Sequence, residues 1–221
     1  MKYQGLILAG GRGSRMGALC DSTPKPMLKV KGRPLIEWIL RRYRDAGFMK
    51  AHIAIRYLGA KISDRYGKSF DGMALNYIVE RDALGTAGCI TLLPEPAPLV
   101  VSNGDLYSSL AWADLIDFHE VGNGTLPDIT ICAVPKTLQY GCLDMSPDII
   151  TERPTVRCNA GMYVLDAHVV RAVMTASAHR QDMPDVINRA AMLGSKVAVY
   201  QLQPGEWADV GTPEDLERAN T

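Results

Sequence analysis

The residues with the clearest chemical potential stand near the start of the chain, in the glycine-rich segment 10–17 (GGRGSRMG). Glycines let successive backbone N–H groups approach an oxyanion without a Cβ in the way. Arg15 and Lys25 add fixed positive charges nearby, as the several negative charges of a triphosphate require. We therefore expect this loop to bind phosphates, and a tight surface loop with solvated arginines is the alternative. The expected contacts with a nucleotide are Leu8, Ala9, Gly10, Gly11, Gly13, Ser14, Arg15 and Lys25.

The spacing within this loop excludes two common phosphate-binding motifs. Met16 stands where the dinucleotide fingerprint G-x-G-x-x-G needs its third glycine. No G-K-[ST] sequence closes the loop, as a Walker A motif would require. The loop is therefore expected to hold a nucleotide by a different arrangement of the same groups.

An acidic residue, Asp105, follows the apolar segment 99–101. The carboxyl ends of strands are where open α/β sheets bind ligands. Mg²⁺ prefers oxygen ligands, of which one or two are protein carboxylates. Asp105 is therefore a candidate metal ligand, but these residues alone favour an Asx-turn residue within 103–105 (NGD).

A second acidic residue, Glu80, ends an alternating segment and is a candidate for base selection. Guanine presents adjacent N1–H and N2–H₂ donors that one carboxylate accepts together, whereas uracil presents one donor flanked by acceptors. The small residues of 84–88 (LGTAG), above all Gly85 and Thr86, would let a base lie against the backbone. These features favour GTP without excluding UTP or CTP. The alternatives are a solvent-facing strand position for Glu80 and an ordinary helix entry at 84–88.

Alternating strands and helices are expected to position these residues. Segment 34–46 has apolar residues at helical spacing, with Pro34 at its start and Gly47 just past its end. Further helices are expected at 111–119, at 185–193 and after Thr212, a predicted N-cap. Apolar patterns predict strands at 5–9, 51–57, 75–80, 99–102, 128–134, 160–165 and 196–202. Such interleaving predicts an α/β fold in which a three-layer, Rossmann-like, mostly parallel but mixed sheet forms a single domain, residues 1–221.

Composition limits the classes of function. With 221 residues and 47% hydrophobic side chains, the chain can build one sizeable core but not two large domains. Lys and Arg total 24, as do Asp and Glu, so no net charge attracts nucleic acid or anionic membranes. Five cysteines without a C-x-x-C pair, and no apolar segment of membrane-span length, fit a cytoplasmic protein. We expect no nucleic-acid or membrane partner, and homo-oligomerisation is left open.

Motifs along the chain also carry a family resemblance. Segments 8–16 (LAGGRGSRM), 24–27 (PKPM) and 30–36 (VKGRPLI) resemble the N-terminal signature of the sugar-1-phosphate nucleotidyltransferases. The resemblance spans nearly the whole chain and continues through 84–88 (LGTAG), 103–105 (NGD), 159–161 (NAG) and 207–215 (WADVGTPED). Within that family the chain most resembles the short bacterial guanylyltransferases that activate mannose, heptose or amino-sugar phosphates.

The resemblance implies a Mg²⁺-dependent enzyme of nucleotidyltransferase fold whose substrates are a nucleoside triphosphate and a sugar 1-phosphate. It implies that Asp209 is a second metal ligand beside Asp105, and a loop acid ahead of the Thr212 cap is the alternative for it. We expect Arg15, Lys25 and Asp105 to be the catalytic residues. The implied sugar-phosphate contacts are Gly141, Glu152, Arg153 and Asn159. Arg153 departs from the family, which usually has Lys at this place, and segment 140–152 is shorter than the family usually has.

The implied reaction transfers a nucleoside monophosphate, with GTP as the expected donor, to the sugar 1-phosphate and releases pyrophosphate. The attacking phosphate is largely dianionic at neutral pH, so the reaction needs charge neutralisation and in-line positioning rather than a strong base. Consistent with this, the four histidines, His52, His119, His168 and His179, have no ligand spacing and are expected in core or surface positions. Two alternatives stay open. One is transfer from CTP or UTP to another phosphorylated acceptor, and the other is a catalytically silent nucleotide-sensing domain.

Overall fold

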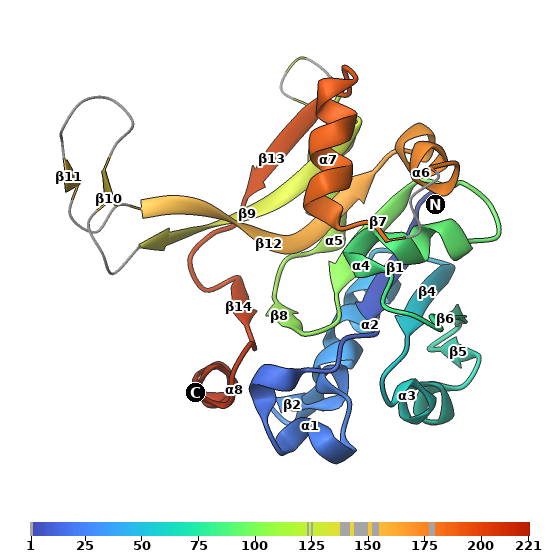
Figure 1. The fold of residues 1–221 in the computed structure, drawn as a ribbon, viewed down its shortest axis with the longest axis vertical. Helices are drawn as coiled ribbons and strands as arrows, with labels where there is room; N and C mark the ends of the chain where they lie inside the picture. The colour runs from blue at the N-terminus through green and yellow to red at the C-terminus, as the bar shows by residue number, and fades with distance from the viewer. Residues whose placement is uncertain are drawn as a thin grey trace.

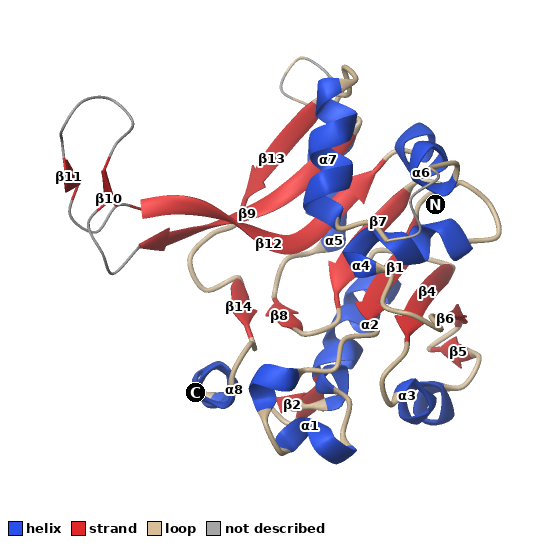
Figure 2. Ribbon diagram, in the orientation of Figure 1, coloured by secondary structure: helices blue, strands red, loops and turns tan. Residues whose placement is uncertain are grey.

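Figures 1 and 2 show the protein in a computed structural model, which describes residues 2–122, 124, 126–137, 142–143, 150–151, 155–176 and 180–221. The strands of the main sheet are β1 (Gln4–Ala9), β4 (Lys50–Ile55), β5 (Ser69–Phe70), β6 (Met73–Val79), β7 (Leu99–Asn103), β9 (Ile129–Thr137), β12 (Thr155–Leu165) and β13 (Val197–Gln201). Short strand pairs are formed by β2 (Lys29–Val30) with β3 (Arg33–Pro34), β8 (Leu106–Ser108) with β14 (Trp207–Asp209), and β10 (Cys142–Leu143) with β11 (Ile150–Thr151).

Helices lie between most of these strands. The α-helices are α1 (Leu19–Ser22), α2 (Leu35–Asp45), α3 (Gly59–Tyr66), α4 (Gly85–Gly88), α5 (Trp112–Val121), α6 (Ala167–Met174), α7 (Met183–Met192) and α8 (Pro213–Asn220). Short 3-10 helices are η1 (Ser14–Met16), η2 (Lys25–Met27) and η3 (Cys89–Leu92). No helix in the described part of the chain has the length and apolar character needed to cross a membrane.

The main sheet has the strand order β13-β9-β12-β7-β1-β4-β6-β5. β1 pairs in parallel with β4 and β7, β4 pairs in parallel with β6, and β9 pairs in parallel with β13. β12 runs antiparallel between β7 and β9, and β5 runs antiparallel to β6 at one edge. The prediction of a mostly parallel but mixed sheet is therefore confirmed.

Apolar side chains on both faces of the sheet bury two cores, which gives the fold three layers. On β1, Ile7 belongs to a core with α2, α3 and α5, whereas Leu6 belongs to a core with α4, α6 and α7. On β7, Val100 belongs to the first core, and Leu99 and Val101 belong to the second. This is the alternation expected of strands whose successive side chains point to opposite faces. In the view of Figure 2, α4 and α7 lie in front of the sheet and α2 lies behind it.

The order in which strands join the sheet reverses at β1. From β1 the chain adds β4 and β6 on one side, and then crosses over to add β7 on the other side (Figure 1). In open α/β sheets, ligands bind in the crevice outside the carboxyl ends of the two strands that flank such a reversal. Here those strands are β1 and β7, which lead into the glycine-rich loop and into Asn103-Gly104-Asp105, respectively.

A buried tyrosine on α2 ties these two strands together. Tyr43 is fully buried, and its hydroxyl donates to the carbonyl oxygen of Val100 at 2.8 Å. The carbonyl oxygen of Leu6 is also within hydrogen-bond distance of this hydroxyl, at 3.2 Å. A Cβ on Gly5 would lie 2.9 Å from the Tyr43 ring. The glycine in β1 thus lets α2 pack directly on the strands that lead to the crevice.

Most predicted elements are confirmed, with shifts at their ends. The predicted helix 34–46 is α2, and α8 begins at Pro213, where Thr212 is the N-cap of a capping box with Asp215. The predicted strand 51–57 is wrong at its end, because β4 stops at Ile55 opposite the last residue of β6. The predicted strand 160–165 is too short, because β12 follows the long strand β9 and already begins at Thr155. The sequence patterns did not predict α3 and α6.

Candidate functional site

Two pockets open side by side in the crevice at the ends of β1 and β7. The loop pocket, with a volume of about 210 Å³, is lined by the glycine-rich loop together with Arg15 and Lys25. The Glu80 pocket, about 260 Å³, is lined by Glu80 and by residues that follow β4, β6 and β7. Leu8, Gly11 and Asp105 line both pockets, so the two form one site.

The structure brings together all the residues predicted to contact a nucleotide. The loop pocket holds Leu8, Ala9, Gly11, Gly13, Ser14, Arg15 and Lys25. The Glu80 pocket holds Leu8, Gly10, Gly11, Glu80, Gly85 and Thr86. Residues far apart in the sequence meet here because parallel strands present their carboxyl ends at the same edge of the sheet.

Glycine is required at particular positions of the loop. A Cβ on Gly10 would lie 2.3 Å from Glu80 Oε2, so Glu80 can occupy its place only beside a glycine. Gly13 has φ +67°, and a Cβ there would lie 2.9 Å from Cys20 Sγ. A Cβ on Gly11 would have no neighbour within 4 Å, and its open face borders both pockets. The loop is therefore shaped by close packing on one side and is open to a ligand on the other.

Lys25 and Asp105 form an ion pair at the boundary of the two pockets. Lys25 Nζ lies 2.6 Å from Asp105 Oδ2. The Lys25 side chain is only 6% exposed and that of Asp105 is 36% exposed, so the carboxylate is the partner that faces the site. Gly104 places this carboxylate, because its N–H donates to the Leu8 carbonyl oxygen at 2.9 Å and joins the end of β7 to the end of β1. A short, charge-assisted bond of this kind fixes both groups.

Glu80 is a buried carboxyl in the wall of the second pocket, with a relative exposure of 8%. Burial raises the pKa of Glu80 above its ordinary value, and the positive charge of Arg56 lowers that pKa in part. Burial of a carboxylate is unfavourable without a partner, which is why the group favours a ligand that donates hydrogen bonds. The solvent-facing alternative for Glu80 is thus excluded.

The segment of Gly85 and Thr86 is held from behind by the start of α7. Thr86 N donates to Asp182 Oδ1 at 3.0 Å, and Met183 N donates to Thr86 Oγ1 at 2.7 Å, so each segment caps the other. Gly85 has φ +81°, and a Cβ there would lie 2.4 Å from the carbonyl oxygen of Gln181. The Thr86 hydroxyl therefore has a structural bond, and the backbone of this segment is what the pocket presents.

Asp209 reaches the site through a separate strand pair. β14 pairs with β8, with Asp209 opposite Leu106, the residue that follows Asp105. Trp207 anchors β14, because its Nε1–H donates to the carbonyl oxygen of Ala160 at 2.9 Å. Asp209 is exposed and lines a neighbouring pocket of about 400 Å³ rather than the loop pocket. Asp209 thus lies on β14, and Asp105 directly precedes the partner strand β8. Their joint role as metal ligands stays a prediction.

Asn159 forms part of a bulge in β12. Asn159 Nδ2 donates to the Tyr163 hydroxyl at 2.8 Å, and Asn159 Oδ1 accepts from Gly161 N at 2.9 Å. The register of β12 against β9 shifts between Asn159 and Tyr163, as a bulge requires. A Cβ on Gly161 would lie 2.5 Å from Asn103 Nδ2, so the bulge packs against a residue of the Glu80 pocket. Asn159 therefore shapes a bulge that adjoins the Glu80 pocket, and its predicted contact with the sugar phosphate stays a prediction.

The other predicted sugar-phosphate contacts are not described. Gly141, Glu152 and Arg153 lie outside the described residues, as do most of segment 140–152 and His179. Their predicted roles stay predictions.

Some residues of the site were absent from the predicted set, among them Pro26, Arg56, Asn103 and Gly211. Arg56 was missed because the alternating pattern of 51–57 places it inside a strand, whereas it directly follows β4. Asp105 was singled out because it is a charged residue beyond the carboxyl end of a strand, and the same signal applies to Arg56. Pro26 and Gly211 lie within motifs 24–27 and 207–215, which carry the family resemblance.

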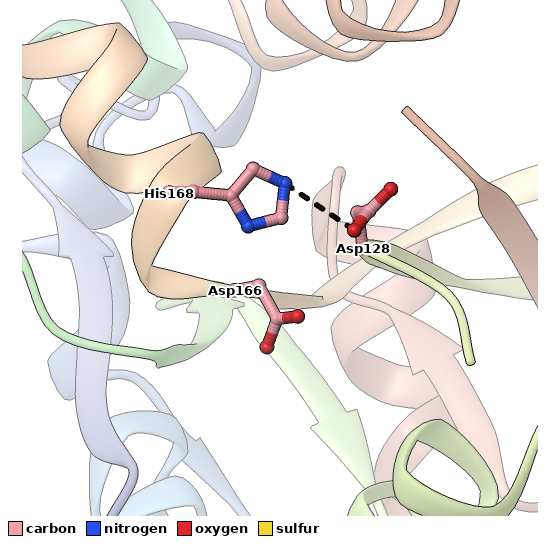
Figure 3. A group of neighbouring side chains, drawn as sticks. All are labelled: Asp128, Asp166 and His168. Atoms are coloured by element: carbon pink, nitrogen blue, oxygen red, sulfur yellow. Dashed lines mark ion pairs between the residues drawn. The ribbon is translucent and has the colours of Figure 1, made fainter. Parts of the chain in front are cut away.

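A group of side chains of types that can ligate a metal lies at the opposite end of the sheet. Asp128, Asp166 and His168 (Figure 3) have ligand atoms within 4.8 Å of one another, and His168 Nε2 is 3.3 Å from Asp128 Oδ1. Asp166 follows β12, which runs antiparallel to β7, so this group lies at the start of β7 whereas Asp105 lies at its end. Asp128 Oδ2 also accepts from Lys196 N at 2.7 Å. The group is thus locally bonded and separate from the two pockets.

Comparisons with known proteins agree with this architecture. Residues 4–221 match the family model described as Nucleotidyl transferase. The chain is 30% identical over 237 residues to the mannose-1-phosphate guanyltransferase of Pichia angusta. The aligned region covers 96% of this chain and 62% of that protein. The structure of HddC from Yersinia pseudotuberculosis complexed with GMP-PN is similar, with a TM-score of 0.73, 23% identity, and coverage of 98% of this chain and 97% of that chain. The structure of a Bacillus anthracis protein in complex with a sucrose has a TM-score of 0.78 at 21% identity. The match covers 99% of this chain and 94% of that chain.

The two solved structures show the likeness of fold. The chain spans 62% of the length of the Pichia relative. The family model, by contrast, extends over nearly the whole chain and includes every predicted site residue. From the site at the ends of β1 and β7 and from this match, we conclude that the chain belongs to the nucleotidyl transferase family.

Proposed function

We propose that the chain transfers a nucleoside monophosphate from GTP to a sugar 1-phosphate, releasing pyrophosphate and giving a GDP-sugar. The observation that carries this proposal is the position of Asp105, which borders both a pocket with Arg15 and Lys25 and a pocket with Glu80. A nucleotide with its phosphates in the first pocket and its base in the second would place its α-phosphorus beside Asp105. The name of the Pichia relative and the GMP-PN bound to HddC support this choice of reaction and nucleotide.

The residues of the loop pocket would act on charge and position. An oxygen of the sugar 1-phosphate forms the new bond to the α-phosphorus, and the bond from the α-phosphorus to the oxygen bridging it to the β-phosphorus breaks. Arg15 and Lys25 would bind the triphosphate and offset its negative charge, and Lys25 is held in place by burial and by Asp105. Backbone N–H groups of the loop would orient the phosphates so that attack is in line with the leaving pyrophosphate.

The donor set at Asp105 and Asp209 fits a magnesium ion. One or two carboxylates, together with phosphate oxygens and waters, are the ligands that Mg²⁺ prefers, and here Asp209 on β14 is paired with the residue that follows Asp105. One oxygen of Asp105 binds Lys25, and we assign its second oxygen to the metal. Bound Mg²⁺ supplies a positive charge that stabilises the negative charge developing on the phosphate oxygens. Asp105 and Asp209 are the residues that would hold it.

We assign the acceptor sugar to Gly141, Glu152, Arg153 and Asn159. Glu152 would accept hydrogen bonds from sugar hydroxyls, and Arg153 would contact the acceptor phosphate through its planar guanidinium. We also propose that the chain takes part in NDP-sugar and polysaccharide biosynthesis in the cytoplasm.

Thermal unfolding with each of ATP, CTP, GTP and UTP, with and without Mg²⁺, tests the donor without any choice of acceptor. A ligand at 100 times its Kd stabilises a protein by about 2.7 kcal/mol, which raises the Tm of a chain of this size by roughly 5–10 °C. We expect a shift of this size with GTP and Mg²⁺, and a much smaller one for Lys25→Ala. A selective shift with UTP or CTP would keep the enzyme class and replace the donor.

Release of pyrophosphate from GTP with a panel of acceptors tests the second half of the proposal. The panel contains mannose 1-phosphate, a heptose 1-phosphate, an amino-sugar 1-phosphate and, as a different class, phosphocholine. We expect turnover with a sugar 1-phosphate only. Turnover with phosphocholine alone would assign a different acceptor class, and GTP binding without turnover by any acceptor would favour a nucleotide-sensing domain.

A further inference from the structure

Arg56 and Glu80 stand next to each other in the wall of the Glu80 pocket. Each directly follows a strand, and the two strands, β4 and β6, are parallel neighbours with Ile55 opposite Val79. Glu80 N donates to the carbonyl oxygen of Ile55 at 3.0 Å, which holds the two strand ends in register. The two side chains therefore start from adjacent positions at the same edge of the sheet.

Gly10 lets both side chains line the pocket. An ideal Cβ on Gly10 would lie 2.3 Å from Glu80 Oε2 and 3.4 Å from Arg56 Cβ, so the absence of a side chain there leaves room for both. Arg56 is exposed and Glu80 is buried, so the guanidinium lies nearer the solvent and the carboxylate lies deeper. Among the described residues, no ion pair occupies either group.

An adjacent acceptor and donor of this kind match two adjacent edges of guanine. The N1–H and N2–H₂ groups are donors and suit a carboxylate, whereas O6 and N7 are acceptors and suit the fork of an arginine. Adenine presents an acceptor at N1 and a donor in place of O6, so the carboxylate contact would be lost and the arginine would keep only N7. Uracil and cytosine have no acceptor that corresponds to N7. A site with Glu80 alone reads one edge, and a site with Arg56 and Glu80 reads both.

We propose that Arg56 is a specificity-determining residue that binds the O6 and N7 edge of guanine while Glu80 binds N1–H and N2–H₂. This inference rests on the proposed function, because it assigns the base of the nucleotide in that same site. Arg56 has a second effect that follows from its position, since its charge favours the ionised form of Glu80 that guanine requires.

Base analogues that lack single atoms test this assignment by binding alone. 7-Deaza-GTP lacks the N7 acceptor, and inosine triphosphate lacks the N2 amino group. Calorimetric titration at fixed Mg²⁺ and salt gives the Kd of each analogue, and of GTP, for the wild-type chain and for Arg56→Ala. Arg81→Ala is the matched control, because Arg81 is exposed, neighbours Glu80 in sequence and lines neither pocket among the described residues.

We expect the wild-type chain to bind 7-deaza-GTP about tenfold more weakly than GTP, consistent with the loss of part of a two-point arginine contact. Arg56→Ala should bind GTP about 10- to 100-fold more weakly, and should no longer distinguish GTP from 7-deaza-GTP. It should still bind inosine triphosphate more weakly than GTP, because Glu80 is retained. Arg81→Ala should behave as the wild-type chain does.

Three outcomes would overturn the inference while leaving the proposed function in place. These are an unchanged preference for GTP over 7-deaza-GTP in Arg56→Ala, an equal loss of GTP affinity in Arg81→Ala, and loss of both atom-specific preferences in Arg56→Ala. The second would mean that only the general positive charge matters, and the third that Arg56 acts through Glu80 rather than on the base itself. Absence of any nucleotide binding by the wild-type chain would overturn the proposed function and this inference together.

Discussion

Asp105 is the residue on which we expect turnover to depend most, because its carboxylate borders both pockets. Asp105→Asn removes the negative charge but keeps an oxygen that accepts from Lys25 Nζ. We therefore expect kcat to fall by at least about 100-fold, the effect of removing one charge-stabilising group from an active site. The loss of unfolding free energy should stay within about 1–3 kcal/mol, because Lys25 keeps a hydrogen-bond partner. Pyrophosphate release and urea unfolding measure the two effects.

Asp64→Asn is a suitable control for this variant, because Asp64 is exposed on α3 and lines neither pocket among the described residues. Asp64→Asn should release pyrophosphate at the wild-type rate and should have the wild-type free energy of unfolding, within experimental error. Pyrophosphate release at the wild-type rate by Asp105→Asn would refute the metal role of Asp105.

We expect Glu80 to lower the free energy of unfolding at neutral pH, although we also expect it to be needed for GTP binding. Burial raises its pKa in the folded state, so the folded state binds the proton more tightly than the unfolded state. The stability that this group contributes is present below its unfolded pKa and is lost as the pH rises through the folded pKa. Glu80→Gln should therefore raise the free energy of unfolding at pH 7, by roughly 0.5–1 kcal/mol, and should weaken GTP binding.

Urea unfolding of wild-type chain and Glu80→Gln at pH 7 and pH 5 checks this prediction. The gain in stability should shrink at pH 5, because the wild-type carboxyl is then closer to its protonated form. A variant that is less stable than the wild-type chain at pH 7 would contradict the prediction and would show that the carboxylate has a favourable partner in the folded chain.

The contact between the start of α4 and the start of α7 depends on Gly85, which has a positive φ angle and no room for a side chain. Gly85 has φ +81°, and a Cβ there would lie 2.4 Å from a backbone oxygen. Gly47 also has a positive φ, of +80°, but a Cβ there would meet nothing within 4 Å. Gly47→Ala should therefore cost only the strain of the backbone, about 1 kcal/mol. Gly85→Ala should cost more, about 2–4 kcal/mol, because the backbone of Gln181 must also move.

Urea unfolding of the two alanine variants separates strain from crowding. Gly85→Ala should also weaken nucleotide binding, since the segment that lines the Glu80 pocket is displaced, whereas Gly47→Ala should leave binding unchanged. Equal stability losses in the two variants would mean that α7 adapts to the extra atom and that the contact with α7 is loose.

Element ends were the part of the fold that sequence patterns predicted least well. The alternation of 51–57 continues through Arg56 and Tyr57, and only the end of the partner strand β6 shows that the sheet stops at Ile55. The start of β12 likewise depends on the length of its neighbour β9. The N-cap at Thr212 was predicted well, because the residues that make a capping box are three positions apart in the sequence. These strand ends depend on a distant partner, whereas the cap at Thr212 depends on local residues.

The stability of the whole molecule should fall in mild acid because of a histidine buried within the sheet. His52 on β4 is 1% exposed, and its Nε2 lies 2.7 Å from Gln4 Oε1 on β1. Burial lowers the pKa of His52 to about 4, with a smaller effect from Lys50. An unfolded histidine has a pKa near 6.5, so between about pH 6.5 and pH 4 the unfolded state binds a proton that the folded state does not. Stability should therefore decrease as the pH falls through that window.

Urea unfolding from pH 7.5 to pH 4.5 measures this dependence. At pH 5 the contribution of His52 to the loss is on the order of 2 kcal/mol. His52→Gln should flatten the curve, and His119, whose pKa is also lowered mainly by burial, should account for part of the remaining slope. A curve of the same slope in His52→Gln and in the wild-type chain would contradict this assignment.

Local sequence determined the chemical groups that this protein has and the elements that carry them. Apolar periodicity identified most strands and helices. The glycines of 10–17, Lys25 and Glu80 were recognisable from residue type and from their place along the chain, and Asp105 from a motif that carries the family resemblance. Such features depend on residues a few positions apart, so they are visible in the sequence itself.

Only the tertiary structure decided which of these groups meet. Lys25 pairs with Asp105, a residue 80 positions away, and Thr86 caps a helix 97 positions away. Arg56 belongs to the site because β4 ends beside the end of β6. Asp209 lies near Asp105 because β14 pairs with β8. These contacts follow from the order and register of strands, which a pattern of apolar residues along one strand does not specify.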